Sequence, residues 1–191
     1  MLYLIDHFSD MPVMSLQVGG QIARLDKPII NPNNLRIVGF YVNGPLHGGK
    51  ILLTEDIREL GDLGAIVDHE DKLVDQEDLV RLHDVLEIDF QLIDKPVITE
   101  RKKRLGKVSD YIVDDLQFMI QKIHIKQSML KNWTAEQLVI HRSQIVEITD
   151  KKIVIKDNLE AVKEEDREVG SREAGSVYSP APSSSASTIS E

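Results

Sequence analysis

The chain has 191 residues, of which 41% are hydrophobic and 29% charged, the balance of a soluble globular protein with room for one large domain or two small ones. It has no cysteine, which excludes disulfides, thiolate catalysis and sulfur-ligated zinc and suits a reducing compartment. No apolar run approaches the roughly 20 residues that span a bilayer, and the N-terminus lacks the features of a secretory signal, so we expect a cytoplasmic protein without a membrane span.

The net charge of −9 is unevenly distributed along the chain. Residues 1–89 hold 16 acidic and 7 basic side chains, whereas residues 90–159 hold 9 acidic and 13 basic ones. Residues 160–191 hold 7 acidic and 3 basic side chains. An acidic and a basic half indicate two structural units.

Two stretches share one pattern of apolar and turn residues, INPNNLRIVGFYV (30–42) and VDDLQFMIQKIHI (113–125). Each pattern predicts a hairpin, with a short strand, a polar turn and an alternating strand. Between Ile120 and Ile123 the alternation slips by one residue, which predicts a β-bulge. The coincident positions are Ile30 and Val113, Asn31 and Asp114, Leu35 and Phe118, Ile37 and Ile120, Phe40 and Ile123, and Val42 and Ile125.

The correspondence continues downstream, where residues 51–60 parallel residues 139–148. The offset grows from 83 to 88, which places five extra residues of the second copy in a loop. Upstream, residues 19–25 loosely parallel residues 94–100. Three blocks in the same order predict an internal duplication.

Each copy offers five or six short strands with turn signals every eight to twelve residues, which favours a small closed or nearly closed sheet. We therefore expect an all-β fold of two tandem small β-barrels, at residues 1–75 and 91–159. A unit of about 70 residues has a thin core, so packing of the units together or exchange of a strand would stabilise them. Between them, residues 76–90 are predicted to form a linking helix capped by Asp75, with Leu79, Leu82, Val85 and Leu86 on one face.

The last segment, residues 160–191, has no phenylalanine, leucine or tryptophan and ends in the low-complexity run SPAPSSSASTIS. Such a composition buries too little apolar surface to offset chain entropy and predicts a disordered acidic, serine-rich tail. A solvated tether and a phosphorylated or partner-binding tail both fit it.

The second copy contains LGKVSDYIVDD (105–115), the strand FMIQKIHI and RSQIVEITDKKIVI (142–155). In these stretches it resembles the PRC-barrel, a small β-barrel found in the cytoplasmic part of the photosynthetic reaction-centre H subunit and in the ribosome maturation factor RimM. Gly106, Lys107, Val108, Asp110, Val113 and Asp114 match the family's opening motif, and Ser143, Ile145, Val146 and Ile148 match its closing strand.

The first copy matches less completely, so the resemblance extends over roughly residues 14–157. Its turn residues Ile30, Asn31 and Pro32 and its closing residues Asp56, Ile57 and Leu60 fit, but it lacks the G-K-V element. The resemblance implies the fold rather than an activity, because the barrel serves as a scaffold in unrelated settings. The chain has neither the membrane helix of the reaction-centre subunit nor the different leading barrel of RimM.

No motif for a nucleophile, a phosphate-binding loop or a dinucleotide site occurs in the chain. His69 with its acidic neighbours suits a hard metal ion in type, but it lacks the spacing of a calcium loop and fits a solvated acidic loop better. His124 and His141 stand as isolated residues on different strands. We therefore expect no catalytic residue, no metal and no cofactor.

The run RKKRLGK is a basic cluster of Arg101, Lys102, Lys103, Arg104 and Lys107. It suits phosphate binding, although little aromatic sequence interleaves it. A plain solvated turn, an RNA contact and docking on an acidic surface, including that of the chain's own first unit, are the alternatives.

The lengthened loop of the second copy brings together Met129, Leu130 and Trp133, residue types enriched at the centres of interfaces. They form either a lid on their own barrel or a site for a partner protein. Taken together, the sequence favours a non-enzymatic adaptor that binds an unidentified protein, with a ribosome- or RNA-associated role as the alternative. The sequence is also compatible with a homodimer.

Overall fold

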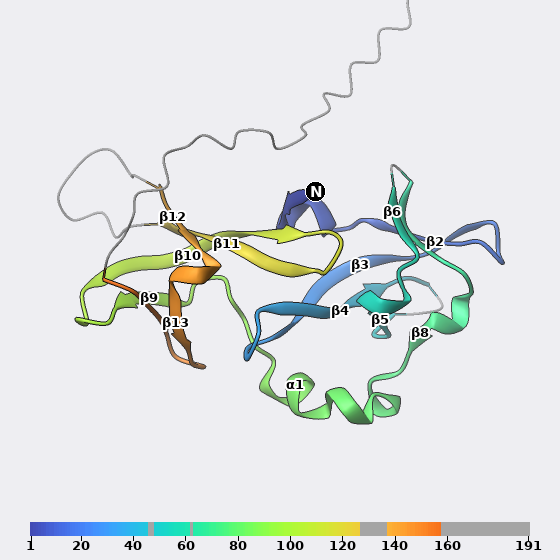
Figure 1. Ribbon diagram of the computed structural model, residues 1–191. Helices are drawn as coiled ribbons and strands as arrows, with labels where there is room; N and C mark the ends of the chain where they lie inside the picture. Colours follow the sequence, from blue (N-terminus) through green and yellow to red (C-terminus); the bar gives the residue numbers. More distant parts are fainter. Residues whose placement is uncertain (46–47, 62, 127–136, 158–191) are drawn as a thin grey trace, which may run out of the picture.

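The computed structural model describes residues 1–45, 48–61, 63–126 and 137–157 and is mostly β-structure (Figure 1). The prediction of an all-β fold is confirmed. Within the described residues there is one α-helix, the short α1 (His83–Ile88). The tail predicted to be disordered, residues 160–191, lies outside the described part of the chain.

Short strands follow one another along both halves of the chain, residues 1–89 and 90–157. The strands of the first half are β1 (Leu2–Leu4), β2 (Pro12–Ser15), β3 (Gly20–Asn31), β4 (Arg36–Asn43), β5 (Ile51–Leu53), β6 (Glu59–Gly61), β7 (Gly64–Val67) and β8 (Leu73–Val74). Those of the second half are β9 (Pro96–Thr99), β10 (Arg104–Asp114), β11 (Met119–Lys126), β12 (Gln137–His141), β13 (Ile145–Ile148) and β14 (Ile153–Ile155).

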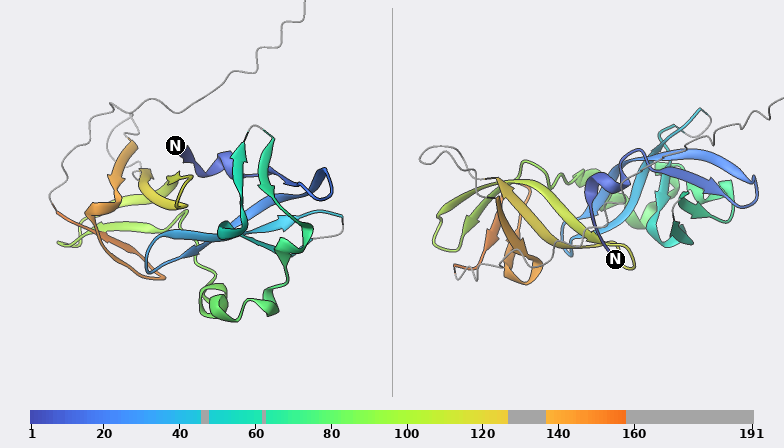
Figure 2. Two further views of the ribbon diagram at one scale, coloured as in Figure 1. Left: turned by 45° about the vertical axis from the view of Figure 1, so that its right-hand side comes forward. Right: turned by 90° about the horizontal axis from the view of Figure 1, so that it is seen from above.

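The two halves pair their strands in the same way. In the first half β2, β3, β4 and β5 form successive antiparallel pairs, β6 pairs with β7, and β2 runs parallel to β7. In the second half β9, β10, β11 and β12 form successive antiparallel pairs, β13 pairs with β14, and β9 runs parallel to β14. Figure 2 shows the two sets of strands side by side.

The long hairpins of the two halves also share their register. In β10–β11 the pairing steps from Ile112–Lys122 to Val113–Ile120 and skips Gln121, so the predicted bulge is confirmed. In β3–β4 the pairing skips Val38 at the matching position. Matching pairs are Leu25–Val42 with Val108–Ile125, Ile29–Gly39 with Ile112–Lys122, Ile30–Ile37 with Val113–Ile120, and Asn31–Arg36 with Asp114–Met119.

The predicted parallel between residues 19–25 and residues 94–100 is wrong. Residues 96–99 form β9, which pairs as β2 does, so DKPVITE takes the place of DMPVMSL at residues 10–16. At the position of the G-K-V element, the first half carries Ala23, Arg24 and Leu25 in β3.

Closure of the two predicted barrels is not confirmed, because the sheet formed by the described residues is not closed. Among the described residues β12 pairs with β11 only, and β13 pairs with β14 only. The 3-10 helix η6 (Arg142–Gln144) separates β12 from β13 and redirects the chain, so these neighbours in sequence do not pair. In the first half the 3-10 helix η2 (Thr54–Asp56) separates β5 from β6 in the same way.

A junction between the turns of the two long hairpins connects the halves into one sheet. The Ile37 N–H donates to the carbonyl of Phe118 at 2.8 Å, and the Ile120 N–H donates to the carbonyl of Leu35 at 2.9 Å. Leu35 and Phe118, the two acceptors, both lie in the left-handed region with φ of 55° and 52°. Each half therefore makes the same contact to the other, as in an isologous dimer.

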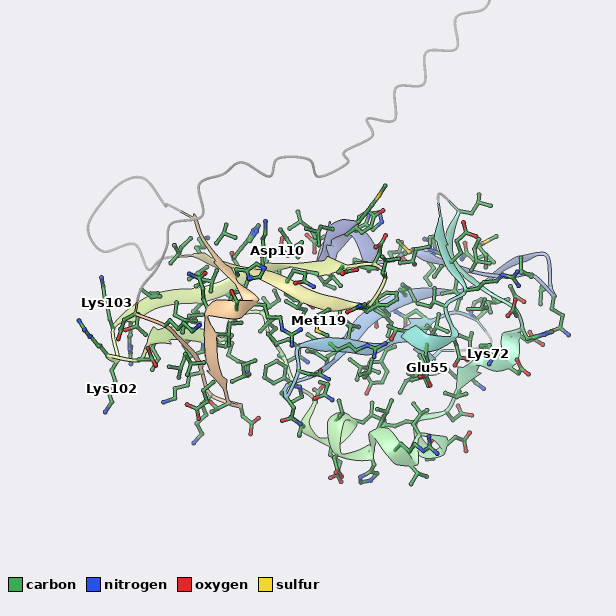
Figure 3. All side chains as sticks on the ribbon, viewed as in Figure 1. Glu55, Lys72, Lys102, Lys103, Asp110 and Met119 are labelled. Atoms are coloured by element: carbon green, nitrogen blue, oxygen red, sulfur yellow. The ribbon has the colours of Figure 1, made fainter. Side chains whose placement is uncertain are left out.

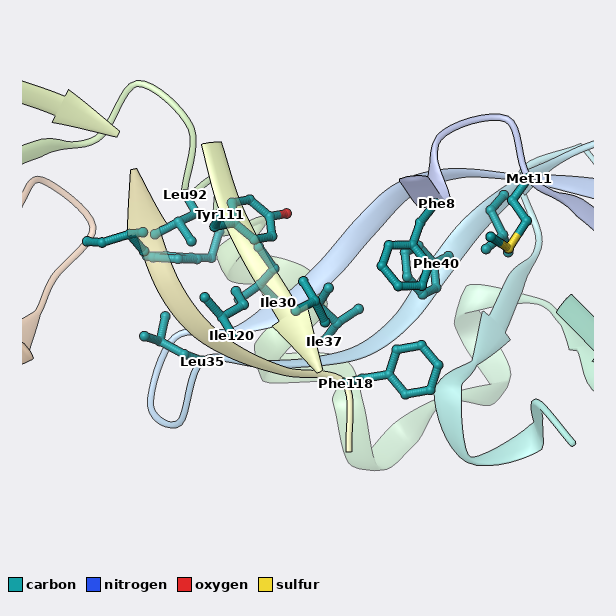
Figure 4. Packing of buried hydrophobic residues seen from close by; sticks show 14 of the residues in the cluster. Phe8, Met11, Ile30, Leu35, Ile37, Phe40, Leu92, Tyr111, Phe118 and Ile120 are labelled. Carbon is teal, nitrogen blue, oxygen red and sulfur yellow. The ribbon is translucent and has the colours of Figure 1, made fainter. Parts of the chain in front are cut away.

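A strand of the first half also crosses to the second, because β1 pairs with β10 (Leu4 opposite Ile112). One hydrophobic core extends through both halves. At its centre the ring of Phe8 lies 5.7 Å from that of Phe40 and 6.1 Å from that of Phe118, between ring centroids (Figure 4). Such aromatic pairs add to the free energy gained from burial.

The segment predicted as a linking helix winds as two 3-10 helices, η4 (Gln76–Asp78) and η5 (Val80–Leu82), before α1. The apolar face expected there does form. Its residues, Leu79, Leu82, Val85 and Leu86, pack in a second cluster against Ile29 and Ile51 of the first half's sheet.

We predict that Gly106→Ala lowers the free energy of unfolding by about 2–4 kcal/mol, from backbone strain and a forced clash. Gly106 has φ of 151°, and a Cβ there would lie 2.2 Å from the carbonyl oxygen of Lys126. Gly20→Ala is the control, because a Cβ at Gly20 has nothing within 4 Å. Urea unfolding measures both variants, and equal midpoints would contradict the prediction.

We predict that Phe118→Ala lowers the stability of both halves together by about 3–5 kcal/mol, since it opens a cavity in the shared core. Leu116→Ala in the same turn should change stability by less than about 0.5 kcal/mol, because Leu116 is 84% exposed and Phe118 only 5%. Hydrogen exchange read separately on β4 and β11 checks the coupling. Loss of protection on β11 alone would show that the halves unfold independently.

Candidate functional site: a basic tip on the second half

The predicted basic cluster lies at the end of the second half remote from the junction. Lys102 and Lys103 occupy the turn between β9 and β10, and Figure 3 shows them at the opposite end of the molecule from Glu55 and Lys72. Antiparallel pairing places the end of β11 beside the start of β10, with Lys126 opposite Lys107. We call this region the basic tip. Its described members are Arg101, Lys102, Lys103, Arg104, Lys107, Lys126 and Lys156.

The β9–β10 turn is held by its own backbone. The Lys102 N–H donates to the Thr99 carbonyl at 2.8 Å, and the Thr99 N–H donates to the Lys103 carbonyl at 2.9 Å. Thr99 is buried, and Lys102 has φ of 64°. Because Thr99 anchors the tight turn in the protein interior, the basic side chains of the turn project into solvent.

Most charges of the tip lack an acidic partner among the described residues. Arg101 pairs with Asp157 at 3.4 Å, and Asp157 also accepts a hydrogen bond from the Arg101 N–H at 3.3 Å. No ion pair within the described residues involves Lys102, Lys103 or Lys107. The like charges of Lys107 and Lys126 face each other across the ladder, which is unfavourable. An anionic ligand would relieve this repulsion.

The face of β10, β11 and β12 next to the tip carries two histidines that the sequence did not place together. His124 lies opposite Asp110 on β10 and Val139 on β12, and His141 lies two residues beyond Val139 on the same strand. Burial lowers the pKa of His124 and raises the pKa of Asp110, while the N–H of Tyr111 offsets part of the latter shift by donating to that carboxylate at 2.7 Å.

The chemistry of this face does not amount to a metal centre. Within the described residues no three histidine or acidic side chains gather closely enough to hold a metal ion. The Nδ1 of His141 accepts from the Ser143 N–H at 3.2 Å and so serves as a cap for η6. The predicted acidic loop is engaged in surface ion pairs, Arg58 with Asp68 and Lys72 with Asp56, each at 2.7 Å.

All five predicted basic residues lie together at the tip. Met129, Leu130 and Trp133 lie outside the described residues. Lys126 and Lys156 join the tip through strand pairing, although neither belongs to the run RKKRLGK. Lys156 directly follows β14, whose parallel pairing with β9 carries it to this end of the sheet; no local pattern reveals that placement.

No helix in the described part of the chain is long and apolar enough to cross a bilayer. No curated protein matches the chain. Residues 87–162 match the family model of the PRC-barrel domain. This match covers the second half, whose strands β9 to β14 present the basic tip. Residues 87–162 of the chain therefore form a PRC-barrel domain.

Proposed function

We propose that this chain is a non-enzymatic cytoplasmic adaptor that holds an acidic partner protein through its basic tip. The observation that carries the proposal is the concentration of exposed lysine and arginine at one end of the PRC-barrel domain, with Arg101 alone paired to an acid among the described residues. Exposed like charges on a rigid turn favour a partner of opposite charge, because complementary fields steer association and select partners.

The first half is, in this proposal, a second PRC-type unit that arose by duplication. The shared strand pairings, the matching hairpin registers and the bulges at Val38 and Gln121 support it. A duplicated scaffold with one basic end suits an adaptor, since one unit can bind while the other braces it. The tip lies away from the first half, so the acidic surface of the first half is not its partner in this proposal (Figure 3).

RNA is the second candidate partner, favoured by the convergence of seven basic side chains at one end of the sheet. Phosphate binding needs only such a cluster, and its affinity falls steeply with salt. Sequence-tolerant binding of single strands also uses aromatic side chains on which bases stack. The stretch ERKKRLGK (100–107) and its neighbours Lys126 and Lys156 offer no aromatic ring, which supports the protein partner over the nucleic acid.

We predict that Lys102→Glu/Lys103→Glu weakens binding of a labelled poly-glutamate peptide at least tenfold, because it reverses two exposed charges of the tip. The control is Lys151→Glu/Lys152→Glu, which makes the same charge change at exposed positions in the β13–β14 turn. Fluorescence anisotropy at 0.15 M salt measures both variants. An equal loss of peptide affinity in the two variants would indicate non-specific charge attraction and would contradict the assignment of the tip as a binding site.

The same titration with a single-stranded RNA of equal charge separates the two partners. We expect weaker binding of the RNA than of the peptide, and capture from native lysate that survives nuclease. Tighter RNA binding that also depends on Lys102 and Lys103, or nuclease-sensitive recovery of ribosomal material, would replace the adaptor with the RNA-associated role.

A further inference from the structure

A pocket of about 270 Å³ lies where the two halves meet, away from the basic tip. Its walls are residues 5, 6, 8, 9, 26–28, 30 and 90–93, together with Tyr111. Its volume is just below the range of roughly 300–1,000 Å³ typical of ligand pockets. The pocket therefore has room for a small organic molecule.

The pocket is built from matching segments of the two halves. Its walls include residues of the segment 5–9, which precedes Asp10, and of the segment 90–93, which precedes Asp94. The Asp10 N–H donates to the carbonyl of Leu25 at 3.0 Å, and the Asp94 N–H donates to the carbonyl of Val108 at 2.8 Å. Both aspartates have a positive φ, 59° and 64°. The pocket thus lies between corresponding segments of the two halves.

Chemically the pocket is aromatic inside and acidic at its mouth. Phe8 and Phe90 are buried, whereas Asp6 and Asp26 are exposed. The one basic residue of the lining, Lys27, is engaged by Asp89 at 2.5 Å. The two carboxylates of the mouth therefore face the pocket without a neutralising base from its lining.

Tyr111 supplies a buried polar group that lacks a partner. The side chain is 2% exposed, and its hydroxyl makes no hydrogen bond within the described residues. In Figure 4 the hydroxyl oxygen is directed to the side on which Phe8 lies. Burial, reinforced by the charges of Asp110 and Asp6, raises the pKa of the phenol, so it stays protonated and able to donate or accept. An unsatisfied buried hydroxyl is unfavourable, and a bound polar group would supply its missing partner.

We propose that this junction pocket binds a small organic cation, an ammonium group carried on an apolar or aromatic body. The carboxylates of Asp6 and Asp26 would hold the ammonium group, and the rings of Phe8 and Phe90 would pack against the body, as aromatic walls do around cations. The hydroxyl of Tyr111 would gain its missing hydrogen bond.

The backbones of the two halves correspond around the pocket, but the side chains at corresponding positions differ. Asp6 stands where the second half has Phe90, and Tyr111 stands where the first half has Pro28. The acidic group thus occurs on one side only, which selects one orientation of a cation with distinct polar and apolar ends. The inference does not depend on the basic tip or on its partner.

The test is a ¹H–¹⁵N NMR titration of the full chain with 2-phenylethylammonium, 2-phenylethanol and 3-phenylpropionate, which have similar size and differ in charge. We expect the cation to shift the amide signals of residues 5–9, 26, 27, 29, 30 and 90–93 and to bind at least tenfold more tightly than the alcohol. The anion should bind most weakly. Absence of shifts at these amides up to millimolar cation, or equal affinity for the alcohol, overturns the proposal.

Variants locate the cation in the pocket. Asp6→Asn/Asp26→Asn should weaken binding at least tenfold, and its exposed positions leave the fold intact. Glu77→Gln/Asp78→Asn is the matched control, because it removes two exposed acids on η4, remote from the pocket lining. Tyr111→Phe should weaken binding about threefold with an unchanged spectrum of the free protein. If both acid-removing variants weakened cation binding equally, the attraction would be a general effect of charge, and the proposed site would be wrong.

Discussion

The reciprocal hydrogen bonds between the hairpin turns determine how the rest of this protein is arranged. The N–H of Ile37 and the N–H of Ile120 each reach across to the other half, where they meet the carbonyls of Phe118 and Leu35. Both residues that supply these carbonyls adopt a left-handed backbone conformation. A buried backbone group must find a partner, so the junction fixes the halves in one relation, within which the aromatic core forms.

Joining the halves addresses the problem of small size. A unit of about 70 residues buries too little apolar surface to be securely stable alone. Phe8, Phe40 and Phe118 come from different parts of the chain and share one cluster. The β1 strand adds a further connection, since it leaves the first half and pairs with β10.

The two candidate sites use different consequences of the same scaffold. The basic tip lies on a turn at the far end of the PRC-barrel domain, where local backbone bonds hold the exposed lysines. The junction pocket exists only because two halves meet, and it combines acidic and aromatic groups. Surface charges are screened beyond roughly 8–10 Å at physiological salt, so the acidic mouth and the basic tip act as separate electrostatic features.

The sequence by itself determined the all-β class, the two long hairpins and the bulge at Gln121, because alternation and turn chemistry are local properties of neighbouring residues. It also located the basic residues of the β9–β10 turn. Only the tertiary structure decided that the sheet stays open, that β9 takes the place of β2, and that the tip gains Lys126 and Lys156. Parallel pairing, strand exchange and a pocket between halves join residues distant in the chain, and their energies depend on packing that no local pattern encodes.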